Sequence, residues 1–176
     1  MRFNLIEMKK QFENTFTKQD LIELEALEKA LQFTSFDSDD ALVLGNLLYQ
    51  KAKPRGAVAI RITREEDELP LFQIIMNGKT QRHLDFGEAK RQTVLNTKHC
   101  SMWALVKEVV DGGLDLFTED SPCLTGSGGF PIIVNGELYG TIFVSGLHEG
   151  QDQLVLVEAL SEFLNIEQPV YNGYIF

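Results

Sequence analysis

Apolar residues recur at helical spacing in three long segments of the chain. In residues 17–33 the leucines lie three or four positions apart, and Thr17 precedes Asp20 with the spacing of a capping box. In residues 36–54 the apolar positions cover more than one stripe, which predicts a deeply packed helix. Residues 150–164 place leucines on one side and glutamates on another, so they predict a final amphipathic helix.

Four short segments rich in β-branched and aromatic residues predict strands: 57–63, 70–76, 130–134 and 138–146. The first two are separated by the charged segment 64–69 and predict an antiparallel pair. The last two are joined by Asn135 and Gly136, a dipeptide typical of a two-residue hairpin turn with positive φ at both positions.

The middle of the chain predicts a loop followed by two helical segments. We expect residues 77–85 to form the loop and the helix to begin at Phe86. The helical pattern continues through residues 101–111, with a break near His99, and ends at the glycine pair 112–113.

The order helix, helix, hairpin, helices, hairpin, helix predicts an α+β fold, with an antiparallel sheet and helices packed on its faces. A chain of 176 residues, 44% of them apolar, is large enough for one compact domain. We expect residues 1–35 to form an N-terminal helical segment and residues 36–176 a single α+β domain, together one globular unit.

Composition narrows the classes of partner. The net charge of −10 disfavours general binding to nucleic acid or to an anionic membrane. No run of eighteen apolar residues predicts a membrane span, and the N-terminus lacks the pattern of a signal peptide. Cys100 and Cys123 form no Cys-x-x-Cys pair, so we expect a reduced, cytoplasmic protein.

Residues 125–147 are rich in glycine, which raises the question of a phosphate-binding loop. Such a loop follows a strand and opens a helix, whereas Gly126, Gly128 and Gly129 precede a predicted strand. We therefore interpret them as a tight turn into the sheet, and Gly140 as a close contact or a bulge. The alternative is a nest of backbone amides that binds an anion.

Few side chains form a recognisable reactive set. Cys100 follows His99 directly, but neighbouring side chains on a helix diverge by about 100° and rarely form a nucleophile and base pair. His83, His99 and His148 are scattered, with no two at i and i+4, so the sequence predicts no metal site.

Three segments, 36–48, 90–101 and 128–164, resemble the haem-degrading-domain superfamily of GlcG-like and HbpS-like proteins, most of all its small microbial branch. The resemblance implies a profilin-like, three-layer fold and assembly into rings of subunits. Because some members bind haem or a corrinoid, it also makes haem or another tetrapyrrole a candidate ligand.

The chain departs from that pattern at three places. Gly126 stands where the branch commonly has a histidine, Phe86 where it has a tryptophan, and Gln153 follows Asp152 where it has Asp-His. Since two histidines are missing, His99 is the remaining candidate axial ligand for haem, and we expect weak binding.

Our leading hypothesis is a non-catalytic small-ligand-binding protein with its pocket between residues 90–101 and 125–130. Lys90 would attract an acid group, and hydroxyls and glycine amides would bind it by hydrogen bonds. The predicted ligand-binding residues are Lys90, His99, Ser101, Thr125, Ser127, Gly128, Gly129 and Phe130. An oligomeric assembly or adaptor protein without a ligand, and an enzyme using Cys100 or His99, remain as alternatives.

The C-terminal segment "QPVYNGYIF" is strongly apolar for a chain end. Together with the ring-forming resemblance, this predicts a homo-oligomer in which residues after Gln168 dock on a neighbouring subunit. The other interpretation is that the segment folds back over its own subunit.

Overall fold

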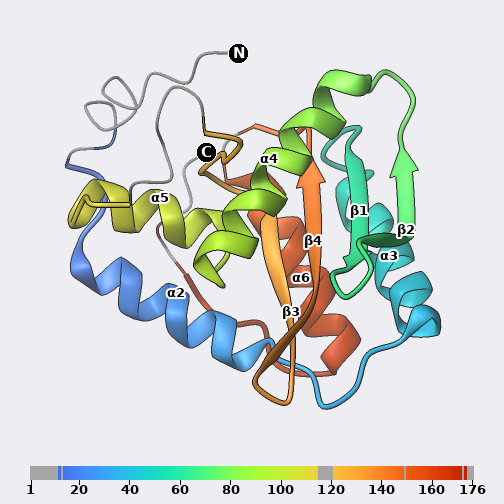
Figure 1. Ribbon diagram of the computed structural model, residues 1–176, viewed down its shortest axis with the longest axis horizontal. Helices are drawn as coiled ribbons and strands as arrows, with labels where there is room; N and C mark the ends of the chain where they lie inside the picture. The colour runs from blue at the N-terminus through green and yellow to red at the C-terminus, as the bar shows by residue number, and fades with distance from the viewer. Residues whose placement is uncertain (1–11, 13, 115–120, 149, 172, 174–176) are drawn as a thin grey trace.

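The computed structural model describes residues 12, 14–114, 121–148, 150–171 and 173, and it is built around a four-stranded antiparallel sheet (Figure 1). The strand order is β2-β1-β4-β3, so the last strands join the first pair through β4. The strands are β1 (Ala59–Arg64), β2 (Leu69–Ile75), β3 (Gly129–Val134) and β4 (Glu137–Ser145).

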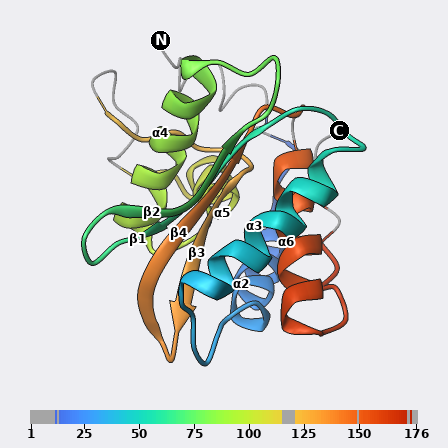
Figure 2. The same ribbon diagram turned by 90° about the vertical axis from the view of Figure 1, so that its right-hand side faces the viewer.

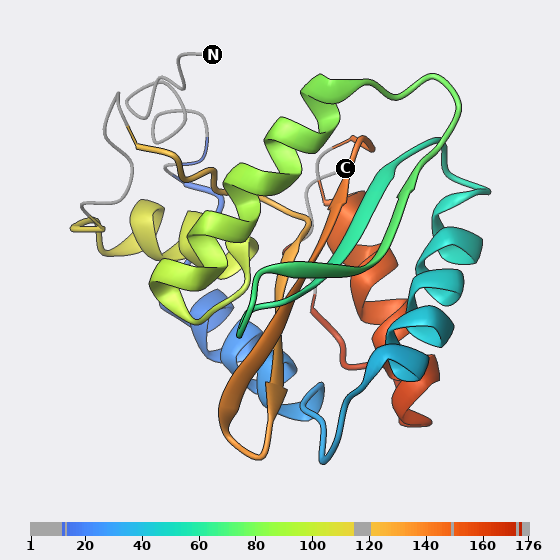
Figure 3. The ribbon, with the colours of Figure 1, turned by 45° about the vertical axis from the view of Figure 1, so that its right-hand side comes forward.

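Helices cover both faces of this sheet, which gives the three layers visible in Figure 2. The helix α4 lies on one face, α3 and α6 lie on the other, and α2 packs against α5 (Figure 3). Their bounds are α2 (Lys18–Ala30), α3 (Ser38–Ala52), α4 (Gln81–Thr97), α5 (Ser101–Val110) and α6 (Gln151–Leu164). The predicted α+β class and the predicted antiparallel pairs are confirmed.

Local capping signals fix the start of the first two of these helices. Thr17 donates its backbone N–H to the carboxylate of Asp20 at 2.6 Å, which completes the predicted capping box of α2. Asp37 caps α3 by accepting the backbone N–H groups of Asp39 and Asp40. Leu24 and Leu27 of α2 belong to the same buried core as the later elements, while the division at residue 35 stays a prediction.

The predicted loop over residues 77–85 is wrong in its second half, because α4 begins at Gln81. Thr80 caps this helix, and its backbone N–H donates to Nδ1 of His83 at 3.1 Å. Glutamate or glutamine usually occupies that position of a capping box, so a histidine there gave no recognisable start signal.

The predicted break near His99 is confirmed. The helix α4 ends at Thr97, Lys98 adopts a left-handed conformation with φ of 60°, and α5 begins at Ser101. This short reversal places the start of α5 beside α4.

The expectation that α3 is deeply packed on all its apolar stripes is wrong. Leu44 and Leu48 are fully buried, but Leu42 is 56% exposed and Val43 is 53% exposed. The sheet and α6 cover α3 from one side only, so the outward stripe of this helix has no cover within the described residues.

Close packing between helices and sheet depends on two glycines. A Cβ atom on Gly45 of α3 would lie 2.3 Å from the ring of Phe72 in β2. On the opposite face, a Cβ atom on Gly87 of α4 would lie 2.2 Å from the ring of Phe143 in β4. Each outer helix therefore approaches the sheet at a point where an aromatic ring fills the space of a missing side chain.

The turn between β3 and β4 has the predicted form. Asn135 has φ of 50° and Gly136 has φ of 83°, as a primed two-residue turn requires. The predicted close contact at Gly140 is also present, because a Cβ atom there would lie 2.5 Å from the carbonyl oxygen of Thr63.

Candidate functional site

A group of buried polar residues lies where α4, α5, α6 and the start of β3 meet. We call this group the polar cluster; it comprises Lys90, Ser101, Gly128, Gly129, Asp152 and Gln153. Lys90 is 8% exposed, Asp152 is 3% exposed, and the side chain of Gln153 is fully buried. Such burial is uncommon for charged residues and requires them to be paired.

An ion pair forms the centre of the polar cluster. Nζ of Lys90 lies 3.1 Å from Oδ2 of Asp152 and donates to the carbonyl oxygen of Val144, also at 3.1 Å. The other carboxylate oxygen of Asp152 accepts the N–H of Leu147 at 3.1 Å. Burial raises the pKa of Asp152, whereas the ammonium group of Lys90 acts in the opposite direction and favours the carboxylate. The ammonium group of Lys90, predicted to attract an acidic ligand, therefore already pairs with an acidic side chain of the same protein.

The glycine turn lets the backbone approach this ion pair. A Cβ atom on Gly128 would lie 2.7 Å from Nζ of Lys90 and 2.2 Å from the carbonyl oxygen of Val144. Its φ of +115° is a conformation that side-chain-bearing residues rarely adopt. Only glycine fits at this position without moving the pair.

Ser101 accepts hydrogen bonds from two backbone N–H groups of the turn. Its hydroxyl oxygen accepts the N–H of Gly129 at 2.8 Å, and its carbonyl oxygen accepts the N–H of Gly126 at 3.1 Å. These two amides are thus engaged within the chain rather than directed at an anion. The turn leads directly into β3, where Phe130 is buried in the hydrophobic core.

Gln153 is the unusual member of the polar cluster. Its amide oxygen and amide nitrogen have no hydrogen-bond partner within the part of the chain that the structure describes. The amide lies near the thiol of Cys100, whose pKa it tends to lower. A buried polar group without a partner costs about 1–3 kcal/mol.

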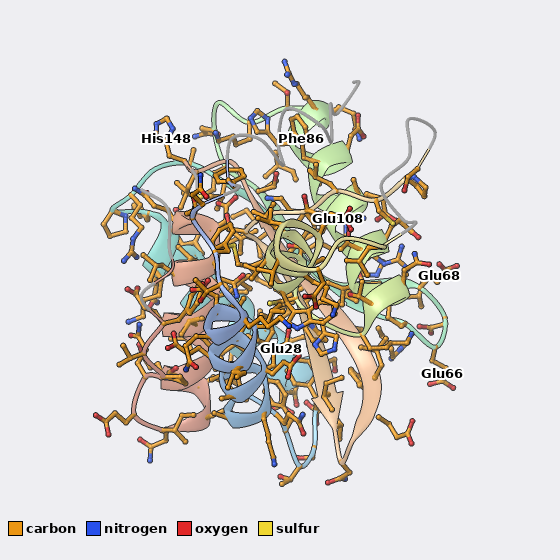
Figure 4. The ribbon with its side chains drawn as sticks, turned by 90° about the vertical axis from the view of Figure 1, so that its left-hand side faces the viewer. Glu28, Glu66, Glu68, Phe86, Glu108 and His148 are labelled. Atoms are coloured by element: carbon orange, nitrogen blue, oxygen red, sulfur yellow. The ribbon has the colours of Figure 1, made fainter. Side chains whose placement is uncertain are left out.

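His99 and Cys100 contact Glu28, which reaches from α2 toward α5 (Figure 4), and Cys100 links these contacts to Gln153. The carboxylate of Glu28 accepts the N–H of Cys100 at 2.7 Å and lies 2.7 Å from Nδ1 of His99. The ring of His99 stacks on Trp103 with centroids 3.9 Å apart. Burial raises the pKa of the Cys100 thiol well above its usual range, which opposes a role as a nucleophile.

The structure thus brings together four of the eight predicted ligand-binding residues: Lys90, Ser101, Gly128 and Gly129. Thr125 is buried and Ser127 half-buried in the turn beside them. Sequence reasoning assigned no role to Asp152 and Gln153, although it noted Gln153 as a departure from the family pattern.

Two further results concern the described residues as a whole. They contain no group of three or more histidine, cysteine, aspartate or glutamate side chains placed to hold a metal ion. None of their helices combines the length and the apolar character that crossing a membrane would require.

Solved structures share this fold class. The crystal structure of Ybr137w protein superposes with a TM-score of 0.73 at 25% identity, covering 82% of this chain and 89% of that one. HbpS superposes with a TM-score of 0.60 at 18% identity, over 76% of this chain and 92% of its own. A PduOC:haem complex gives a TM-score of 0.61 at 15% identity, over 77% and 99%.

The family model described as "Haem degrading protein HbpS-like" matches residues 36–161, and the chain belongs to this family. A UPF0303 protein of Rhizobium rhizogenes is 35% identical over 158 residues, covering 85% of this chain and 94% of its own length. Another, from Paraburkholderia phymatum, is 33% identical over 150 residues, covering 82% and 90%. The resemblance derived from the sequence is therefore confirmed.

The ion pair of the polar cluster leads to a first prediction. Lys90→Met and Asp152→Leu should each destabilise the protein by about 3–5 kcal/mol, because each leaves a buried charge without its partner. The double variant should lose less than the sum of the two. Since burial raises the pKa of Asp152, the carboxyl of Lys90→Met becomes neutral as the pH falls, so this variant should lose less stability at pH 5 than at pH 8.

Urea unfolding of the four proteins at both pH values measures these differences. Lys51→Met is the control, because Lys51 pairs with Glu162 at the surface and its loss should cost less than about 1 kcal/mol. Additive losses in the double variant would show that the two charges do not depend on each other.

Proposed function

We propose that this chain is a non-catalytic small-ligand-binding protein and that its ligand binds at the polar cluster. The observation that carries this proposal is the buried amide of Gln153, which has no hydrogen-bond partner of regular geometry among the described residues. It lies beside the thiol of Cys100, and it follows the ion-paired Asp152 in the sequence. A purely structural position would be served as well by apolar side chains, which often replace buried ion pairs without loss of stability. Proteins retain such costly polar groups mainly where function requires them.

The chemistry of the polar cluster suggests the kind of ligand. The amide of Gln153 can both donate and accept a hydrogen bond, while Lys90 would attract an acid group that competes with Asp152. A small molecule carrying a carboxylate and a neighbouring hydroxyl or amide meets both requirements. Binding of such a molecule would give the amide of Gln153 hydrogen-bond partners and so offset the free-energy cost of burying that amide.

Gln153→Leu tests this function directly. We expect native mass spectrometry of the parent to detect a co-purified small molecule, and the variant to have lost it. The ligand-free variant should melt at the same temperature as the ligand-free parent or higher, because it no longer buries an unpaired amide.

Gln50→Leu, on the exposed side of α3, is the matched control and should retain the ligand. A parent without any bound molecule, together with a lower melting temperature for Gln153→Leu, would assign the amide a structural role and refute the proposal.

Haem is a second candidate ligand, supported by the arrangement around His99. The solved PduOC structure is a complex of that protein with haem, and histidines that ligate metals commonly donate their other nitrogen to a carboxylate. Here Glu28 lies beside Nδ1 of His99 in that manner, which leaves Nε2 for the iron. Bound haem would supply an iron centre, and this chain would hold it through His99.

We expect weak haem binding, since the chain carries a net charge of −10 that repels the propionates. Titration followed by the Soret band measures it, with His99→Ala as the variant that should abolish it. A tight complex that persists in His99→Ala would rule out this assignment.

Assembly into a homo-oligomer is also proposed, and the exposed stripe of α3 supports it. Leu42 and Val43 are more than half exposed, and β2 next to α3 is an edge strand of the sheet. In the C-terminal segment, Tyr171 packs into the core of its own chain, while Val170 is 76% exposed. Tyr174, Ile175 and Phe176, which the sequence predicts to dock on a neighbour, lie outside the described residues.

Light scattering tests the assembly. We expect Leu42→Glu/Val43→Glu to form a smaller species than the parent, because two charges would be buried in the contact. Ile22→Glu, at a residue that is 60% exposed on α2, is the control and should leave the assembly intact. A monomeric parent would refute the oligomer, and removal of residues after Gln168 separately measures the contribution of the tail.

A further inference from the structure

Two turns at one end of the sheet enclose a groove that the polar cluster does not use. One is the turn between β1 and β2, and the other joins β3 to β4 (Figure 3). The N–H of Glu65 donates to the carbonyl oxygen of Tyr139 at 3.0 Å, which ties the two turns together. The groove has a volume of about 480 Å³ and is lined by Glu65, Glu66, Val134, Glu137, Leu138 and Tyr139.

The floor of the groove is apolar and held in place. Val134, Leu138 and Tyr139 are half-buried and line the groove. The ring of Phe36 packs against Tyr139 with centroids 5.5 Å apart. A supported floor of this kind offers a fixed surface for an aliphatic side chain.

The walls of the groove carry carboxylates with different roles. Glu65 is fixed by Arg91, at 2.9 and 2.6 Å, and by the hydroxyl of Thr141, which donates to it at 2.6 Å. Glu66 and Glu137 are exposed, and neither forms an ion pair or side-chain hydrogen bond with the described residues. Both carboxylates are therefore accessible to a partner, and Glu137 is the one with no arginine beside it among the described residues.

Two arginines near the groove compensate part of this negative charge. Arg64 pairs with Asp67 and lies within electrostatic range of Glu66. Arg91 is shared among the carboxylates of Glu65, Glu68 and Glu88. Glu66 and Glu68 lie at the same edge of the molecule (Figure 4), where Glu68 pairs with Arg91. The groove thus combines an apolar floor with an excess of negative charge at its rim.

We propose that this groove docks a short basic segment of a partner protein, independently of the ligand site at the polar cluster. An arginine of the partner would lay its aliphatic stem on the apolar lining of the groove and pair its guanidinium with Glu66 or Glu137. Charge complementarity favours this occupant, because anionic lipids and nucleic acid would be repelled by the same carboxylates.

Binding of a labelled six-residue peptide of alternating arginine and leucine tests the proposal. The full chain should bind it in 50 mM NaCl, and the affinity should fall by about tenfold or more in Glu66→Gln/Glu137→Gln. The matched control is Glu23→Gln/Glu167→Gln, which removes the same charge elsewhere and should bind as the parent does. All three proteins should melt at nearly the same temperature, because Glu66, Glu137 and Glu167 are exposed and the half-buried Glu23 accepts only a long hydrogen bond from Gln19.

A peptide of arginine and glycine and the polyamine spermidine separate the two contributions. Both should bind at least about tenfold more weakly than the arginine and leucine peptide, because neither fills the apolar floor. Equal competition by spermidine would show that charge alone is recognised and would overturn the proposal. An equal loss in the control variant, or no binding by the parent, would overturn it as well.

Discussion

The ion pair between Lys90 and Asp152 connects the two helical layers of this protein. Lys90 comes from α4 on one face of the sheet, and Asp152 from the first turn of α6 on the other. The same ammonium group also binds the carbonyl oxygen of Val144 in β4, so helix, strand and helix meet at one point. Because both charges are buried, removing either partner would leave the other charge uncompensated and would lower the stability of the protein. The segments that pass close to the pair must therefore leave room for it.

The glycine turn and the start of α5 follow from that constraint. Gly128 has no side chain that could displace the ammonium group, and Ser101 holds the turn by accepting two of its amides. Gln153 follows Asp152 directly in α6 and is fully buried, with its amide beside the thiol of Cys100 and without a hydrogen bond of regular geometry among the described residues. The residue that suggests a ligand thus belongs to the same helical turn as the acid that joins the layers.

Much of the fold could be predicted because its signals are local. The capping pair of Thr17 and Asp20, and the dipeptide Asn135-Gly136, each act within a few residues. The candidate site depends on Lys90 meeting Asp152, 62 positions away, and no periodicity encodes that contact. The start of α4 and the exposure of Leu42 were missed for related reasons. A histidine replaced the usual capping residue, and helical spacing does not show how many sides of a helix are covered.

The two glycines that face aromatic rings have a consequence for sequence variation. A side chain at Gly45 would overlap the ring of Phe72, and one at Gly87 would overlap the ring of Phe143. Relatives that carry alanine or a larger residue at either helix position should therefore carry a smaller residue at the matching strand position. The two pairs lie on opposite faces of the sheet, so they should change independently of each other, and an alignment of family members should show two separate correlations rather than one.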